Sequence, residues 1–423
     1  MAEKSDKTFV GFGFGPIQSG LFLFEAYRSR NFSRFVVAEI DQDLVRAIRA
    51  NGGRYTINIA RKDRIDQFEL NGIELYNPRE AKDRQTIIEA ISTSDEMATG
   101  LPSVNIYPLG DQASVVSLLA EGLGRELPRV IYAAENHNHA AEILLEHLTK
   151  KVPAEELATV RILNTVIGKM SGVLTDADEI RRLGLTTITP GISRAVLVEE
   201  FNRILISRID LAGYQRGIEV FIEKENLLPF EEAKLYGHNA IHALLAYLAD
   251  WKGMTTVAQA GNDREIMAIA RRAFIEESGA ALIRRHQNFK DTLFTAEGYQ
   301  AYADDLLERM VNPNLNDLVS RVGRDHVRKL GYEDRLYGTM NLALHYGVVP
   351  KNLAVGAAAG ILSMIKRQGS FEKPVSQLPP SEGELSEPIL RELLLGLWAS
   401  KVDQQGERLI SLTWDALKSL RHI

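Results

Sequence analysis

The sequence predicts an α/β fold, in which an N-terminal, doubly wound parallel sheet precedes a mostly α-helical C-terminal domain. Apolar runs of strand length alternate with helical patterns in the first half of the chain, as in parallel sheets whose strands are joined by helices. A glycine-rich turn follows the first of these runs. From Pro229 onward helical patterns dominate, so we expect two domains, residues 1–228 and 229–423.

The composition is that of a globular protein. The chain has 423 residues, 45% hydrophobic and 25% charged, with a formal net charge of -6. This charge offers no basic excess for nucleic acid, and no apolar run is long enough to span a bilayer. There is no cysteine, which excludes disulfides and thiolate sites. The N-terminal MAEKSDKT does not look like a signal peptide, so we expect a cytoplasmic protein. Its expected partner is a small molecule.

The first predicted strand, Lys7–Phe12, enters the turn GFGFGPIQSG. Gly13 and Gly15 can serve as the first two glycines of a Rossmann-like dinucleotide turn, with Pro16 opening the helix and Ile17 in its first turn. Gln18 occupies the place of the third glycine. Such a turn can also join a strand to a helix without any ligand.

Further polar residues and glycines follow predicted strands. Ser33–Ile40 contains Glu39 near its end, and an acid there can bind both ribose hydroxyls of NAD while repelling the 2′-phosphate of NADP. The alternative is a solvated acid at a strand end. Predicted strands Val104–Pro108 and Arg129–Ala134 are followed by Gly110 and Asn136. Ligands bind at this edge of a doubly wound sheet. Asp63–Glu74 is predicted to be a hairpin that turns at Asn71-Gly72.

A helical pattern over Pro229–Gly253 is apolar on nearly all sides, which is typical of a buried helix. It contains Lys234, Asn239 and His242, which fall within an arc of roughly 140° at about 100° per residue. A buried ammonium tends to have a lowered pKa, as required of a lysine that takes a proton from an alcohol. Alternatively, Lys234 reaches water, Asn239 binds backbone and His242 is an ordinary core histidine.

A basic segment, Arg321–Arg335, begins on a predicted helix, Leu315–Lys329. Its guanidinium groups suit a phosphate. The alternative is a helix surface on which Asp317, Asp325 and Asp334 form ion pairs with the arginines.

Three C-terminal segments together resemble the polyol-specific long-chain dehydrogenases. These segments are KLYGHNAIHALLAYL at Lys234–Leu248, FIEESGAALIRRH at Phe274–His286 and NPNLNDLVSRVGRDHVRKLGYEDRL at Asn312–Leu336. The glycine turn, Ala38-Glu39, Leu109-Gly110 and Ala134-Glu135-Asn136 match more loosely. The likeness is weakest in Lys150–Asn226 and in the tail.

The resemblance implies an NAD-dependent enzyme without a metal that interconverts a polyol, or a hexitol phosphate such as mannitol 1-phosphate, and its ketose. It implies Lys234 as general acid/base, Asn239 and Asn136 as groups that polarise the reacting oxygen, and His242 as a ligand of substrate hydroxyls. Gly13, Gly15, Ile17, Glu39 and Gly110 would bind the cofactor. The resemblance also implies Arg321 as a substrate contact, and the basic segment adds Arg324 and Arg328 as candidate substrate contacts.

Two departures from the family pattern leave the substrate open. Gln18 stands in the glycine turn, and Ser171-Gly172 stands where the family carries Asp-Arg. A keto-uronate reductase and a non-catalytic dinucleotide-binding sensor remain alternatives. A metal site of His137, His139, His238 and His242 is disfavoured because no carboxylate has ligand spacing. The oligomeric state, monomer or dimer, stays open.

Overall fold

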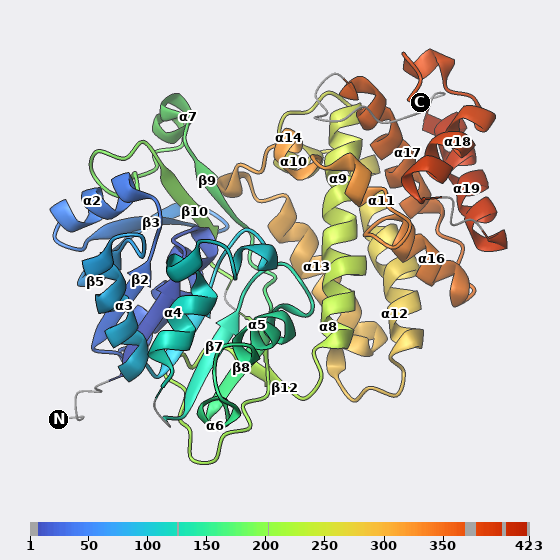
Figure 1. The fold of residues 1–423 in the computed structure, drawn as a ribbon. Coiled ribbons are helices and arrows are strands. Elements are labelled where there is room, and N and C mark those ends of the chain that lie inside the picture. Colours follow the sequence, from blue (N-terminus) through green and yellow to red (C-terminus); the bar gives the residue numbers. More distant parts are fainter. Residues whose placement is uncertain (1–6, 125–126, 202, 369–377, 400–402, 421–423) are drawn as a thin grey trace. The chain divides into compact units, whose positions relative to one another are not determined.

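The computed structural model describes residues 7–124, 127–201, 203–368, 378–399 and 403–420. The chain divides into two compact units, Met1–Leu228 and Pro229–Ile423 (Figure 1). The predicted α/β fold class is confirmed, since the first unit combines sheets with connecting helices and the described part of the second is helical. Within the described residues, no helix combines the length and apolar character needed to span a bilayer.

The larger sheet of the N-terminal unit has the strand order β12-β11-β8-β7-β6-β1-β2-β5. The strands from β8 to β5 run parallel, and β11 is antiparallel to β8. Parallel strands joined by helices produce the doubly wound arrangement. The strands are β1 (Thr8–Phe12), β2 (Arg34–Ala38), β5 (Ile73–Tyr76), β6 (Glu96–Thr99), β7 (Arg129–Ala133), β8 (Val160–Val166), β11 (Leu205–Ser207) and β12 (Ile222–Lys224).

The N-terminal unit also contains a smaller sheet, in which the hairpin differs from the predicted one. Its order is β4-β3-β10-β9, formed by β3 (Tyr55–Ala60), β4 (Ile65–Leu70), β9 (Ser171–Leu174) and β10 (Ala195–Glu199). The hairpin consists of β3 and β4, with Arg61 and Arg64 joined by a backbone hydrogen bond at the turn. Asn71-Gly72 instead links β4 to β5, which belongs to the larger sheet. The turn signal was local, whereas strand partners are chosen by distant contacts.

Side chains of the larger sheet enter two cores, one on each face, because successive strand residues point to opposite sides. Phe9 faces a core shared with Leu21 and with Val198 of the smaller sheet. Val10 and Phe12 face a second core built mainly from three helices, α3 (Ala81–Thr93), α4 (Val115–Gly122) and α5 (Ala140–Thr149). Both faces are thus covered, as parallel sheets require.

One segment of this unit that was predicted to be a strand is helical. Val104–Pro108, predicted as a strand, contains the 3₁₀ turn η2 (Val104–Ile106). The sheet strand in this region is β6, which the sequence analysis missed. The remaining helices are η1 (Gln18–Phe22), α1 (Leu23–Ser29), α2 (Gln42–Ala50), η3 (Asp111–Ala113), α6 (Ala154–Leu157) and α7 (Ala177–Arg182).

The C-terminal unit is built around α9, which continues from α8 through η4 as one rod (Figure 1). Its helices are α8 (Leu228–Glu232), η4 (Ala233–Asn239), α9 (Ala240–Trp251), α10 (Val257–Ala260), α11 (Arg264–Arg272), η5 (Ala273–Gly279), α12 (Ala280–Arg285), η6 (Thr292–Phe294), α13 (Ala296–Met310), η7 (Pro313–Leu315), α14 (Val319–Val322), α15 (His326–Lys329), α16 (Tyr337–His345), α17 (Lys351–Lys366), η9 (Glu382–Glu384), α18 (Glu387–Leu397) and α19 (Gln404–Leu420). The predicted helix Leu315–Lys329 is wrong, because α14 and α15 are separate short turns.

Small residues allow α17 to approach α9 closely. A Cβ atom at Gly356 would lie 2.6 Å from Leu244 Cγ, and one at Gly360 would lie 3.0 Å from Tyr247 Cδ2. Leu244 and Tyr247 are fully buried. The rod that carries Lys234, Asn239 and His242 is therefore held rigidly by close packing.

Candidate active site

The glycine turn lies at the carboxyl ends of three neighbouring strands. Gly13 has φ +82°, its N–H donates to the carbonyl oxygen of Ala38 at the end of β2 (2.8 Å), and a Cβ there would lie 3.1 Å from the carbonyl oxygen of Gly100 after β6. At Gly15 an added Cβ would meet nothing closer than 3.9 Å. The backbone is thus open at Gly15 and Ile17 follows at the start of η1, an arrangement that fits a pyrophosphate at a helix N-terminus.

Gln18 is accommodated by two other glycines. Its side chain is fully buried, and its carboxamide occupies the space beside Gly11, where an added Cβ would lie 2.2 Å from Nε2. Its Cβ would lie 3.1 Å from a Cβ placed on Gly100. The departure at the third glycine position therefore leaves the turn intact, because the missing side chains at Gly11 and Gly100 provide the room.

Glu39 follows β2 directly, as expected of the acid that contacts a ribose. Its N–H donates to the carbonyl oxygen of Tyr76, and its Oε1 accepts from the N–H of Asp41 (2.8 Å). Asp41 caps α2 and forms an ion pair with Arg194 (3.0 Å). The carboxylate of Glu39 is thus fixed at the sheet edge beside the glycine turn.

Gly110 does not end a strand. It lies exposed before η3 with φ +106°, so its predicted place at the sheet edge is wrong. The residue at that edge is Gly100, directly after β6. Sequence patterns do not predict this position, because β6 begins and ends with polar residues, Glu96 and Thr99. Because Gly110 does not lie at the edge of the sheet, its position does not support the predicted contact with the cofactor.

Asn136 lies in the exposed loop after β7, as predicted. The preceding residue, Glu135, fixes that loop. Its carboxylate accepts hydrogen bonds from Thr99 Oγ1 (2.8 Å), from the N–H of Leu101 (2.9 Å) and from Tyr107. Glu135 therefore joins the loops that follow β6 and β7, a positioning role that the sequence analysis did not assign.

Lys234 and Asn239 lie on a π-helical segment, η4, and not on a regular α-helix. In an α-helix residues five apart would be separated by roughly 140°. The i→i+5 hydrogen bonding of a π-helix brings such residues to neighbouring positions on successive turns. The Lys-x4-Asn spacing therefore suits this geometry, and both side chains are partly buried. Burial lowers the pKa of Lys234 to about 8, opposed by the attraction of Glu231 and assisted by Arg335.

A second π-helical segment, η5, supports the first. Ser278 Oγ donates to the carbonyl oxygen of Tyr236 in η4 (2.8 Å) and lies 3.1 Å from the hydroxyl of Tyr299. Thr339 Oγ1 donates to the same carbonyl (3.2 Å). The widened turn thus has side-chain hydroxyls that satisfy its backbone. Ser278 belongs to the EESGA segment, so this motif has a structural role.

His242 faces a buried carboxylate. Its Nε2 lies 2.8 Å from Asp317 Oδ2, and neither atom has another hydrogen-bond partner among the described residues. The second oxygen of Asp317 accepts from Arg321. Two residues predicted to contact substrate are therefore joined through one carboxylate, whose own side chain is only 2% exposed.

Arg328 and Arg335 of the basic segment form ion pairs with aspartates, as the alternative interpretation of this segment expects. Arg328 contacts Asp325 and Asp334, and Arg335 Nε donates to Asp334 (2.8 Å). Arg324 and Arg328 are exposed. Lys329 is buried and donates to the carbonyl oxygen of Val322, and burial, together with Arg335 and Arg328, lowers its pKa to about 7.

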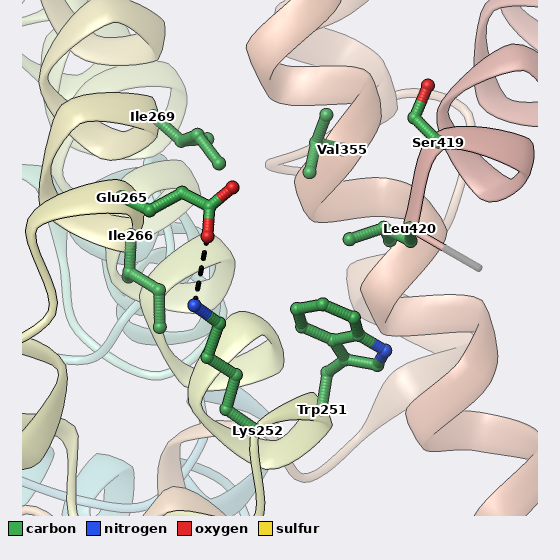
Figure 2. Close-up of a pocket in the computed structure, with 8 residues that line it drawn as sticks. All are labelled: Trp251, Lys252, Glu265, Ile266, Ile269, Val355, Ser419 and Leu420. Carbon is green, nitrogen blue, oxygen red and sulfur yellow. Dashed lines mark hydrogen bonds and ion pairs between the residues drawn. The ribbon is translucent and has the colours of Figure 1, made fainter. Parts of the chain in front are cut away.

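In the part of the chain that the structure describes, neither a group of metal ligands nor the small hollow shown in Figure 2 provides an alternative to the site around Lys234. No group of three or more potential metal ligands occurs among the described residues. The hollow has a volume of about 60 Å³ and is lined by Trp251, Lys252, Glu265, Ile266, Ile269, Val355, Ser419 and Leu420 (Figure 2). Sites for small molecules usually measure hundreds of Å³, and none of the predicted site residues lines this one.

Comparison with known proteins shows similarity to mannitol dehydrogenases. Residues 226–370 match the profile described as mannitol dehydrogenase C-terminal domain. Mannitol-1-phosphate 5-dehydrogenase from Caldanaerobacter subterraneus subsp. tengcongensis is 29% identical over 317 residues, which cover 74% of this chain and 76% of the relative. The chain therefore carries a mannitol dehydrogenase C-terminal domain and is similar to mannitol-1-phosphate 5-dehydrogenases, which supports the polyol-specific long-chain dehydrogenase family. These matches confirm the resemblance that the three C-terminal motifs carry. The protein is an oxidoreductase that acts on a CH–OH group.

Two solved structures share the fold of this polyol dehydrogenase. A substrate-free D-sorbitol dehydrogenase has a TM-score of 0.75 at 13% identity and covers 99% of this chain and 94% of its own. Mannitol 2-dehydrogenase from Pseudomonas fluorescens, in a ternary complex with NAD and D-mannitol, has a TM-score of 0.66 at 15% identity and covers 99% and 92%. At this identity the likeness concerns the fold alone.

Proposed function

We propose that this enzyme interconverts a polyol and its ketose with NAD, and that its substrate is a hexitol phosphate such as mannitol 1-phosphate. The observation that carries the proposal is the placement of Lys234, with its lowered pKa, and Asn239 on the same π-helical segment. The relative named mannitol-1-phosphate 5-dehydrogenase supports the substrate class, and the glycine turn with Glu39 fits NAD better than NADP.

The proposed chemistry assigns one task to each group. Bound NAD supplies the acceptor for the hydride of the carbinol carbon. Neutral Lys234 takes the hydroxyl proton on its Nζ, which leaves a ketone and an ammonium. The carboxamide of Asn239 donates to the oxygen on which negative charge develops, and Asn136 is proposed as a second donor. In the reverse direction, the ammonium of Lys234 returns the proton.

His242 and Arg321 are proposed as ligands of the substrate. An imidazole binds a hydroxyl, and a guanidinium binds a phosphate by two parallel hydrogen bonds. Arg328 is a weaker candidate for a substrate ligand, because its guanidinium already forms ion pairs with Asp325 and Asp334. For Arg324, the only support is its position in the basic segment. Neither the uronate nor the sensor alternative has an observation of its own in this structure.

Lys234→Ala tests the proposal. We expect turnover of mannitol 1-phosphate, measured by NADH absorbance, to fall about 10²- to 10⁴-fold, the contribution of general acid/base catalysis. The dissociation constant of NADH, measured by fluorescence, should change little. In parallel, the unmodified enzyme is assayed by NADH absorbance with a set of polyols, polyol phosphates and uronates. Turnover retained by Lys234→Ala would disprove the role of the lysine, and activity confined to a uronate would disprove the substrate.

A further inference from the structure

Asp317 is held by backbone contacts on both sides. It lies between η7 and α14, after Asn316, which has φ +48°. The carbonyl oxygen of Asp317 accepts from the N–H of Val257 (2.9 Å), and the N–H of Val319 donates to the carbonyl oxygen of Thr255 (2.9 Å). Leu318 forms an antiparallel bridge with Thr256. These contacts fix the backbone, so the position of the Asp317 carboxylate is fixed with it.

The carboxylate is buried and remains charged. Burial raises the pKa of Asp317, but the nearby His242 and Arg321 more than offset this effect, so its pKa lies below the ordinary value. A buried carboxylate is costly unless charged or polar partners surround it. Arg321 occupies one oxygen and His242 Nε2 lies against the other. Asp317 therefore stabilises one orientation of both side chains.

This contact selects the ring nitrogen that His242 can offer to a ligand. A neutral imidazole that donates through Nε2–H carries its lone pair on Nδ1. Nδ1 is then the ring atom left to accept the proton of a substrate hydroxyl. The ring centroid of His238 lies 6.1 Å from that of His242. Burial lowers the pKa of His238, and the nearby His242, Arg309 and Lys234 lower it further, so His238 adds no positive charge beside His242 near neutral pH.

We propose that Asp317 is a positioning residue, which holds His242 in the Nε2–H tautomer and Arg321 in place so that both bind the polyol substrate. This inference rests on the proposed function, since it concerns ligands of the same substrate. It predicts that the effect of Asp317 on the reaction passes through His242 and Arg321 rather than through the stability of the fold.

A double-mutant cycle tests this inference. Asp317→Asn keeps the size of the side chain but removes the charge, and His242→Ala removes the group that it positions. We expect Asp317→Asn alone to lower kcat/KM about ten-fold or more, mainly through KM, and to have a much smaller effect in the His242→Ala background. Equal losses in both backgrounds would show that Asp317 acts only through general structure and would overturn the inference.

The ¹⁵N spectrum of the nine histidines provides a measurement independent of turnover. The signal lost in His242→Ala identifies His242, which should be in the Nε2–H tautomer in the unmodified protein and a mixture of tautomers in Asp317→Asn. An unchanged tautomer would contradict the inference even if the enzyme used a different substrate. Asp304→Asn is the matched control, because it breaks an exposed carboxylate–arginine pair with Arg271 (2.9 Å) and should alter neither kcat/KM nor the spectrum.

Discussion

Lys234 differs from an ordinary surface lysine in the range of pH over which its amine is neutral. Burial lowers its pKa to about 8, and Arg335 adds to this effect. At pH 8 about half of the amine is neutral, whereas a lysine with an ordinary pKa of about 10.4 would be almost entirely charged. The proposed oxidation needs the neutral amine, and the reverse reduction needs the ammonium.

The pH dependence should therefore have opposite signs in the two directions. Below about pH 8, kcat/KM for polyol oxidation should fall roughly ten-fold per pH unit as Lys234 becomes protonated. For ketose reduction, kcat/KM should fall above about pH 8. Removing the positive charge in Arg335→Met should move the inflection to higher pH in initial-rate measurements. An inflection that does not move would contradict the electrostatic role of Arg335.

At the scale of elements, two π-helical segments cross where glycines replace larger residues. A Cβ on Gly237 of η4 would lie 2.7 Å from the hydroxyl oxygen of Tyr299 and 2.9 Å from Phe274 Cε2. A Cβ on Gly279 of η5 would lie 2.6 Å from Tyr299 Cδ1. The close crossing allows Ser278 to reach the carbonyl oxygen of Tyr236, so packing and hydrogen bonding support the same turn.

Gly237→Ala should destabilise the protein by about 1–3 kcal/mol, as overpacked cores do, and should lower kcat because the turn carries Lys234 and Asn239. Thermal unfolding and initial rates measure the two effects. Adding Tyr299→Phe should restore part of the stability by removing the nearest atom. Gly383→Ala is the control, since an added Cβ there meets nothing closer than 3.9 Å. Equal unfolding temperatures for the Gly237 and Gly383 variants would refute the crowding argument.

At the scale of the whole molecule, the division into two units assigns the predicted cofactor residues and the lysine motif to different parts of the chain. The glycine turn and Glu39 lie in Met1–Leu228, and Lys234, Asn239 and His242 lie in Pro229–Ile423. The naming of these units as dinucleotide-binding and catalytic stays a prediction, which ligand binding can test.

NAD at 100 times its dissociation constant should stabilise the folded protein by about 2.7 kcal/mol, seen as a higher unfolding temperature. Hydrogen exchange should slow at residues 11–20 and 38–44, where the turn and Glu39 lie. NADP should have a much weaker effect, and Glu39→Ala should reduce the difference between the two nucleotides. Equal stabilisation by NAD and NADP would contradict the role of Glu39.

The failures of sequence-based prediction share one cause. Strand β6 was missed because it carries Glu96, whose buried carboxylate accepts from Tyr132 Oη (2.9 Å) and from the N–H of Gly217. A polar residue belongs in a buried strand only when such partners exist, and these lie 36 and 121 positions away. The same limitation placed Gly110 at the sheet edge instead of Gly100 and drew the hairpin around Asn71-Gly72.

The sequence alone determined the α/β class, the resemblance to polyol dehydrogenases and the Lys-x4-Asn-x2-His spacing, because periodicity, glycine turns and motifs are local properties of the chain. Only the tertiary structure revealed the π-helical geometry of η4 and the carboxylate of Asp317 against His242. Both depend on contacts between residues distant in sequence, such as Ser278 with Tyr236 and Asp317 with His242. Local patterns do not specify these contacts, since folding selects them by packing and by the need to pair buried polar groups.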